Sequence, residues 1–138
     1  MRYIARSAIS DVSDNIWSRF NSDTGSNYTY HLIEGTGSSV SAGAGSSQTR
    51  NLFGRCAGNT ASSNVFGAAV IDILDYSDTN KFTTIRNLAG DDNNGNGSMR
   101  FESGLWRNTA AVNALTITTN ASDNFLQYSQ FALYGIKG

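Results

Sequence analysis

Short runs of β-forming residues, separated by clusters of Gly, Asn, Ser and Asp, follow one another along the whole 138-residue chain. Within the runs apolar and polar residues alternate, whereas no stretch of ten residues carries the 3.6-residue stripe of an amphipathic helix. Several short strands at regular spacing, with turn residues between them, are typical of a sandwich or barrel. The pattern therefore predicts an all-β fold: an antiparallel, jelly-roll-like β-sandwich of about eight strands.

The expected strands and core follow from the position of the large apolar residues. Strands are expected at residues 2–8, 16–20, 28–34, 65–76, 81–88, 98–106, 112–118 and 131–136. The expected core consists of large apolar residues near the strand centres, namely Phe20, Ile71, Ile73, Ile85, Phe101, Leu115, Ile117 and Leu133. Neither half of the chain has enough strands to bury its own core, so residues 1–138 are expected to form a single β-sandwich domain.

One segment of low complexity, GTGSSVSAGAGSSQ at Gly35–Gln48, interrupts the run of strands. Its small residues predict a flexible loop. The alternative is an arm that becomes ordered only against a partner.

A second turn-rich segment, DDNNGNG at Asp91–Gly97, joins two expected strands. Asn-Gly pairs favour hairpin turns because both central residues must accept a positive φ. The segment also resembles the start of a calcium loop, but Ser103 stands where the bidentate acid would be required. A plain hairpin turn without a metal is the prediction.

Charge and composition exclude several partners. The formal net charge is −1 and only 15% of the residues are charged, so no basic surface is available for phosphates or anionic lipids. No apolar run approaches the ~18 residues of a membrane-spanning helix. The single cysteine, Cys56, has no partner for an intrachain disulfide. We expect no nucleic-acid and no membrane partner.

Few residues suggest catalysis. His31 and Cys56 are the only residues of their types, too few for a zinc site, and a nucleophile–base pair would require them to be adjacent in space. Asp72 and Asp75 have odd spacing, so a strand places them on opposite faces. The G-x-S-x-G, G-x-G-x-x-G and Walker patterns are absent. The sequence predicts a non-enzymatic protein with no catalytic residue and no cofactor.

The aromatic residues have two interpretations. Trp17, Trp106 and six Tyr could form a platform for sugar rings. Aromatic residues are equally suited to a sandwich core or to a subunit interface, which is the interpretation we favour.

Four segments, taken together and in this order, carry a family resemblance. They are RFNSDTGSNYTYHLIEGTGSS at 19–39, IDILDYSDTNKFTTIRNLAGDD at 71–92, SGLWRNTAAVNALTITT at 103–119 and FALYGIKG at 131–138. The chain resembles β-sandwich virion proteins of tailed bacteriophages over nearly its whole length. In that family residues usually precede the R-x-x-AR motif, here Arg2–Arg6, so the chain is expected to be either a complete protein or the C-terminal part of a longer one.

The resemblance implies a structural role in the virion, as a capsid decoration or cement protein or as a fibre or tail component. It implies a homotrimer in contact with other virion proteins, such as the major capsid or tail proteins. The candidate interface residues are Tyr134, Ile136, Val40, Trp17 and Trp106. The alternative is a receptor- or carbohydrate-binding module, such as a tail-fibre knob that recognises the host surface.

Overall fold

The computed structural model describes residues 1–136, which form ten strands and no helix. The strands are β1 (Arg2–Ala5), β2 (Ser13–Phe20), β3 (Tyr28–Gly35), β4 (Val40–Gln48), β5 (Asn51–Ala57), β6 (Gly67–Leu74), β7 (Thr83–Asn93), β8 (Asn96–Trp106), β9 (Leu115–Thr119) and β10 (Gln130–Ala132). All pairings between these strands are antiparallel. The all-β prediction is confirmed, with ten strands instead of about eight.

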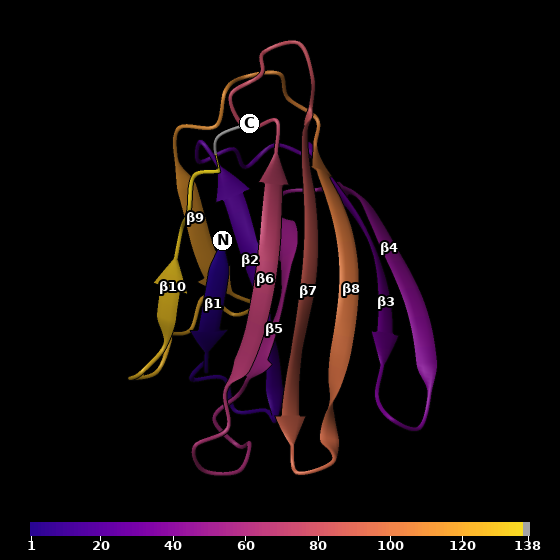
Figure 1. Cartoon of the computed structure of the whole chain (residues 1–138), viewed down its shortest axis with the longest axis vertical. Helices are drawn as coiled ribbons and strands as arrows, with labels where there is room; N and C mark the ends of the chain where they lie inside the picture. The colour runs from indigo at the N-terminus through magenta and orange to yellow at the C-terminus, as the bar shows by residue number, and fades with distance from the viewer. Residues whose placement is uncertain (137–138) are drawn as a thin grey trace.

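The strands form two layers of unequal size. The large sheet has seven strands in the order β10-β1-β6-β7-β8-β3-β4, and the small sheet has three in the order β5-β2-β9 (Figure 1). This arrangement is a β-sandwich, while the jelly-roll connectivity stays a prediction. Along β6, β7 and β8 buried and exposed residues alternate strictly over most of each strand. The large sheet therefore has an inner face, packed on the small sheet, and an outer face that the small sheet does not cover.

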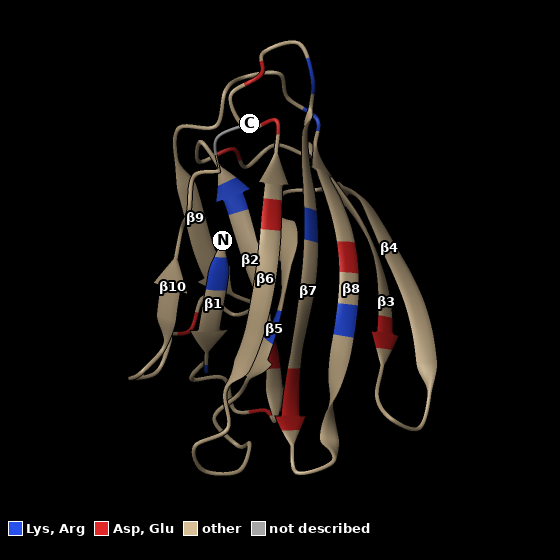
Figure 2. Ribbon diagram, viewed as in Figure 1, with Lys and Arg blue, Asp and Glu red and all other residues tan. Residues whose placement is uncertain are grey.

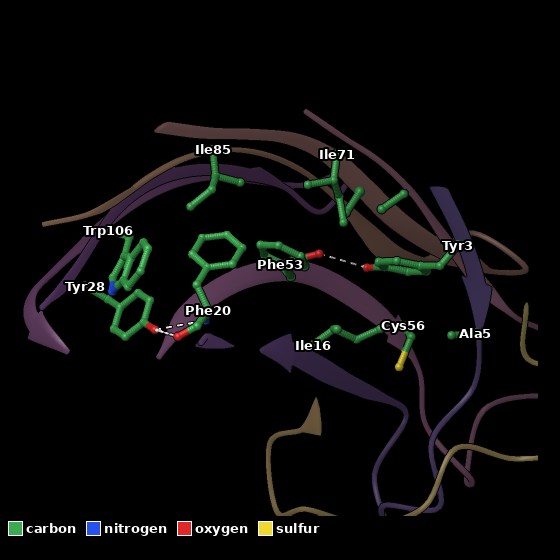
Figure 3. Packing of buried hydrophobic residues seen from close by; sticks show 12 residues of the cluster. Tyr3, Ala5, Ile16, Phe20, Tyr28, Phe53, Cys56, Ile71, Ile85 and Trp106 are labelled. Atoms are coloured by element: carbon green, nitrogen blue, oxygen red, sulfur yellow. Dashed lines mark hydrogen bonds between the residues drawn. The ribbon is translucent and has the colours of Figure 1, made fainter. Parts of the chain in front are cut away.

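The core between the sheets is built around aromatic rings. Phe20 packs against Phe53 and Trp106, with ring centroids 6.2 and 5.5 Å apart, and Tyr28 stacks on Trp106 (Figure 3). The Tyr28 hydroxyl also accepts a hydrogen bond of 3.0 Å from the Phe20 amide. Of the residues expected in the core, Phe20, Ile71 and Ile85 are fully buried, while Ile73, Leu115 and Ile117 are partly buried and pack at its margin.

Two core predictions are wrong. Phe101 is 61% exposed because β8 turns Arg100 and Glu102 inward, which directs Phe101 to the outer face. Leu133 is 70% exposed because β10 ends at Ala132, so the strand expected at 131–136 is wrong beyond that residue.

The flexible loop predicted for Gly35–Gln48 is also wrong, because Val40–Gln48 forms the edge strand β4. Its small residues lie opposite large side chains of β3. A Cβ atom on Gly45 would be 2.5 Å from a ring carbon of Tyr30, and one on Gly43 would contact Leu32. The glycines therefore give these side chains room to lie across β4, and an intramolecular partner orders the segment.

Strand β5, which the sequence pattern did not predict, places the small sheet on the large one. Its residues are buried on both sides, so the sequence shows no alternation. At Gly54 the φ angle is +107°, and a Cβ atom there would lie 2.5 Å from Ala89 Cβ and 2.7 Å from the Tyr3 hydroxyl. Only glycine allows this close approach.

Truncating a large side chain should affect the free energy of unfolding differently on the two faces of the large sheet. Ile71→Ala should lower the free energy of unfolding by about 2–5 kcal/mol, because it leaves a cavity in the core. Phe101→Ala should lower it by less than about 1 kcal/mol, because the ring is mostly exposed. Urea denaturation at low protein concentration measures both, and the reverse ranking would contradict the assignment of the faces.

Gly54 can be tested against a matched glycine. Gly54→Ala should cost about 1–3 kcal/mol more than Gly37→Ala, because the new methyl group overpacks the contact with Ala89 and Tyr3. Gly37 also has a positive φ, of +85°, but no atom lies within 4 Å of a Cβ built there. Both variants place an alanine at a positive φ, so both carry backbone strain. Equal melting temperatures would show that the contact with Ala89 and Tyr3 does not limit how closely β5 approaches the large sheet.

Candidate functional site: the outer face of the large sheet

The outer face of the large sheet carries exposed apolar side chains on most of its strands. Its exposed apolar side chains come from six strands: Ile4, Ile33, Val40, Val70, Leu74, Leu88, Met99 and Phe101. Met99 and Phe101 are 65% and 61% exposed. Single exposed apolar residues are ordinary on a soluble protein, but a contiguous set of this kind marks an interaction surface.

Strand register makes these residues contiguous. Val70 is the Cα partner of Leu88, Leu88 that of Phe101, and Phe101 that of Ile33. Directly opposed side chains on neighbouring strands have Cβ atoms about 5 Å apart. The four side chains therefore form an unbroken apolar band across β6, β7, β8 and β3.

The next row along the strands contains a hollow. It reads Ile4, Ala68, Gly90, Met99, Gly35 and Val40 in register. The small residues lower the surface between the large ones, and a shallow hollow of about 790 Å³ lies here, lined among others by Ala68, Gly90 and Met99.

Figure 2 shows charged residues on β1, β3, β6, β7 and β8 of this sheet, and only some of them are at exposed positions. On the exposed positions of the two adjacent central strands, Asp72 of β6 is the Cα partner of Arg86 of β7. Arg2 lies in the neighbouring row, opposite Val70, and Asp92 is near the end of β7. The apolar surface thus carries one pair of opposite charges near its middle.

The inner face of the same sheet holds a charged network. Arg55 of β5 contacts Glu34 of β3 with an N–O distance of 2.6 Å, and Arg100 of β8 contacts the other Glu34 oxygen at 3.0 Å. Arg55 Nε lies 3.4 Å from Asp91 Oδ1. Burial tends to raise the pKa of Glu34, but the hydrogen bond and charge of Arg100 outweigh it and lower the pKa. The network links the two sheets through side chains.

Glu102 is a buried acid beside this charged network. It is 1% exposed, lies 3.8 Å from Arg100, and neither of its oxygens has a hydrogen-bond partner among the described residues. Burial raises the pKa of Glu102 to about 6, against the lowering influence of Asn87 and Arg100. An acid enclosed between two sheets has no access to a substrate, so we assign it to the protein interior.

Two candidate interface residues are wrong. Trp106 is 1% exposed, and its indole N–H donates to Asp23 Oδ2 at 2.7 Å. Trp17 is 8% exposed and is covered by Arg50, whose guanidinium carbon lies 4.2 Å from the centre of the ring. Neither ring can therefore form a sugar platform or a subunit contact.

The other three candidates are exposed but lie apart. Val40 begins β4 at one edge of the large sheet, whereas Tyr134 and Ile136 follow β10 at the opposite edge. Tyr134 and Ile136 line a groove of about 550 Å³ beside Leu74 and Leu115. Only Val40 belongs to the outer face.

The residues considered for catalysis are not brought together. Cys56 is fully buried, and burial raises the pKa of its thiol to about 12. His31 is exposed on the outer side of β3, opposite Ser103. Asp72 is exposed on β6, while Asp75 contacts Lys81 at 3.2 Å.

Within residues 1–136 no three His, Cys, Asp or Glu side chains are close enough to hold a metal ion. The Asp91–Gly97 segment forms the β7–β8 hairpin, with Asn94 and Gly95 both at positive φ, which confirms the predicted turn.

The apolar residues of the outer face other than Val40 were not identified from the sequence as candidates for contact. The signal that could have found them is the strict alternation in β6, β7 and β8, whose two faces both carry large apolar residues.

No protein-family model matches this chain, and neither a curated protein nor a solved structure matches it. The part of the chain that the structure describes contains no helix able to span a membrane.

Glu102 predicts a dependence of stability on pH. Its pKa rises from 4.5 to about 6 on folding, so the folded state binds this proton more tightly than the unfolded state does. The resulting stabilisation is complete below pH 4.5 and is lost as the pH rises through 6, a change of about 2 kcal/mol.

Glu102→Gln should therefore stabilise the protein by a similar amount at pH 7 and by little at pH 4. Thermal unfolding at both pH values measures the difference. Asp123→Asn, which removes an exposed carboxylate from a loop outside the large sheet, controls for the change in net charge. An equal effect of Glu102→Gln at both pH values would contradict the assignment.

Proposed function

We propose that this chain is a non-enzymatic structural protein of a tailed-bacteriophage virion and acts through protein–protein contacts. The observation that carries the contact function is the exposed apolar outer face, with its continuous band Val70, Leu88, Phe101 and Ile33. The virion setting is supported by the resemblance of the four sequence segments to that family. The burial of Cys56, and its separation from the exposed His31, is consistent with the absence of a nucleophile–base pair.

Within the virion we propose a place as a capsid decoration or cement protein, or as a fibre or tail component. Both roles need large contact surfaces that do not depend on charge. Because the outer face is mainly apolar, its contacts should withstand high salt. The major capsid protein or a tail protein is the partner expected in each case.

The threefold symmetry implied by the resemblance stays a prediction. Of its expected contact residues, Tyr134, Ile136 and Val40 are exposed and available, whereas Trp17 and Trp106 are not.

The test is a count of copies in purified particles of the phage that encodes the chain. The tryptic peptide 7–19 lacks Met, Cys and Asn-Gly, so an isotope-labelled version is a stable standard for mass spectrometry. The major capsid protein in the same digest provides the reference for the number of particles. Hundreds of copies per particle indicate decoration, and a few indicate a fibre or tail component. Absence from purified particles would contradict the proposal.

A further inference from the structure

We propose that the free edge of β4 binds an extended segment of another protein, which joins the large sheet as a further strand through main-chain hydrogen bonds. The inference adds a second contact surface to the proposed function and does not depend on the virion setting. It is carried by the length and exposure of β4, by the direction of its backbone groups and by the row of side chains that ends on it.

Among the described strands, β4 forms a long sheet edge with no strand beside it (Figure 1). It has nine residues, and residues 40–44 are all exposed. The other three sheet edges are short or buried, because β10 has three residues, β9 has five, and β5 is buried along almost its whole length. Strand addition is therefore far less hindered at β4 than at the other edges.

The edge of β4 also lacks the features that keep exposed strands from pairing. Proteins commonly protect such edges with charged residues, with proline or with a bulge that twists the strand away. No charged residue occurs between Glu34 and Arg50, and the chain has no proline. The register with β3 shifts only beyond Gly45, so residues 40–45 form a regular strand with an open edge.

The backbone of β4 directs hydrogen-bonding groups outward at every second residue. The Thr36 amide donates to the Ser39 carbonyl at 3.0 Å, so these residues form a hydrogen-bonded pair at the end of the β3–β4 hairpin. Hydrogen-bonded and non-hydrogen-bonded pairs alternate along an antiparallel ladder. Counting from that pair, Val40, Ala42 and Ala44 turn their N–H and C=O groups away from β3. Among the described residues these groups have no main-chain partner, and an added strand would supply one for each.

The row of outer-face side chains that ends on β4 indicates what the added strand carries. Ala42 is the Cα partner of Ile33, the last large residue of the apolar band. Ile33 is 57% exposed, since Ala42 has only a methyl group to place beside it. A large apolar residue opposite Ala42 would lie over that methyl group and contact Ile33, as Tyr30 lies over Gly45 from the β3 side. We therefore expect a strand with large apolar side chains at alternate positions.

A second copy of β4 fits this row less well. An antiparallel pair centred on Ala42 would place Ala42 opposite its own counterpart and Val40 opposite Ala44. These side chains are too small to cover Ile33. The row therefore favours a strand of a different sequence, and pairing with a second copy is an outcome that the test distinguishes.

A synthetic peptide tests the edge. The probe is acetyl-Thr-Leu-Thr-Tyr-Thr-Leu-Lys-amide with a fluorescent label on the lysine, and it alternates large apolar side chains with threonine. Fluorescence polarisation with the full chain should show saturable binding with a Kd of about 1 mM or below. A peptide of the same composition without the alternation should bind at least about tenfold more weakly.

Proline on the edge removes one outward N–H group. Ala42→Pro should weaken peptide binding at least about tenfold, because it deletes a donor from the open edge while leaving the hydrogen bonds to β3 in place. Ala42→Ser is the matched control, since it keeps the N–H group and should bind as the wild type does. Circular dichroism confirms that both variants are folded.

Methylated peptides make the test independent of the folding of any variant. With the large side chains on the outer face, the amides of the Leu and Tyr residues point toward β4, and N-methyl groups on them should abolish binding. N-methyl groups on the Thr amides lie on the other edge of the peptide and should preserve binding.

The proposal would be overturned by absence of peptide binding, by equal binding of the two methylated peptides, or by equal binding to Ala42→Pro and Ala42→Ser. A wild-type dimer that Ala42→Pro converts to a monomer, measured by light scattering, would show that a second copy occupies the edge and would overturn the choice of partner. Peptide binding by a chain that is absent from virions would support this inference and contradict the proposed function. Presence on virions without peptide binding would do the opposite.

Discussion

The contact of β5 with the inner face of the large sheet determines how the rest of the molecule is arranged. Because Gly54 has no side chain, β5 lies directly against Ala89 and Tyr3, and its neighbour Arg55 reaches the charged network. The small sheet continues from β5 through β2 to β9 and has only three strands, whereas the large sheet has seven. One face of the large sheet is thus covered and the other is left to solvent.

Strand β8 reverses the usual distribution of residues in a half-exposed sheet. It places Arg100 and Glu102 inside and Met99 and Phe101 outside. Buried ion pairs add little net stability, since desolvation offsets most of their attraction. The exposed Phe101 ring and Met99 thioether add little either. The stability of the isolated chain therefore explains neither the buried charges nor the exposed apolar residues of β8. Both features are consistent with a sheet whose outer face is buried in an assembly.

The fold class was predictable from the alternation of short strands, but the assignment of the faces was not. In β8 large apolar residues occur on both sides, and choosing the side of Phe101 instead of that of Trp106 reverses every residue of the strand. β5 shows no alternation because both of its sides are buried, and β4 consists of small residues that become ordered through Tyr30 and Leu32. The residues that determine the structure of β4 and β5 therefore lie in the neighbouring strands and not in these two segments themselves.

The position of β1 has a consequence for the order in which the molecule folds. Arg2 pairs with Val70 on one side and with Ala132 on the other, so β1 has no partner until distant parts of the chain have been synthesised. The hairpin of β7 and β8, in contrast, is local and closes around Asn94 and Gly95. Folding that depends on such distant pairings is slow. Until β1 is in place, the edge of β6 has no strand beside it, and an unpaired strand edge can pair with another partly folded chain.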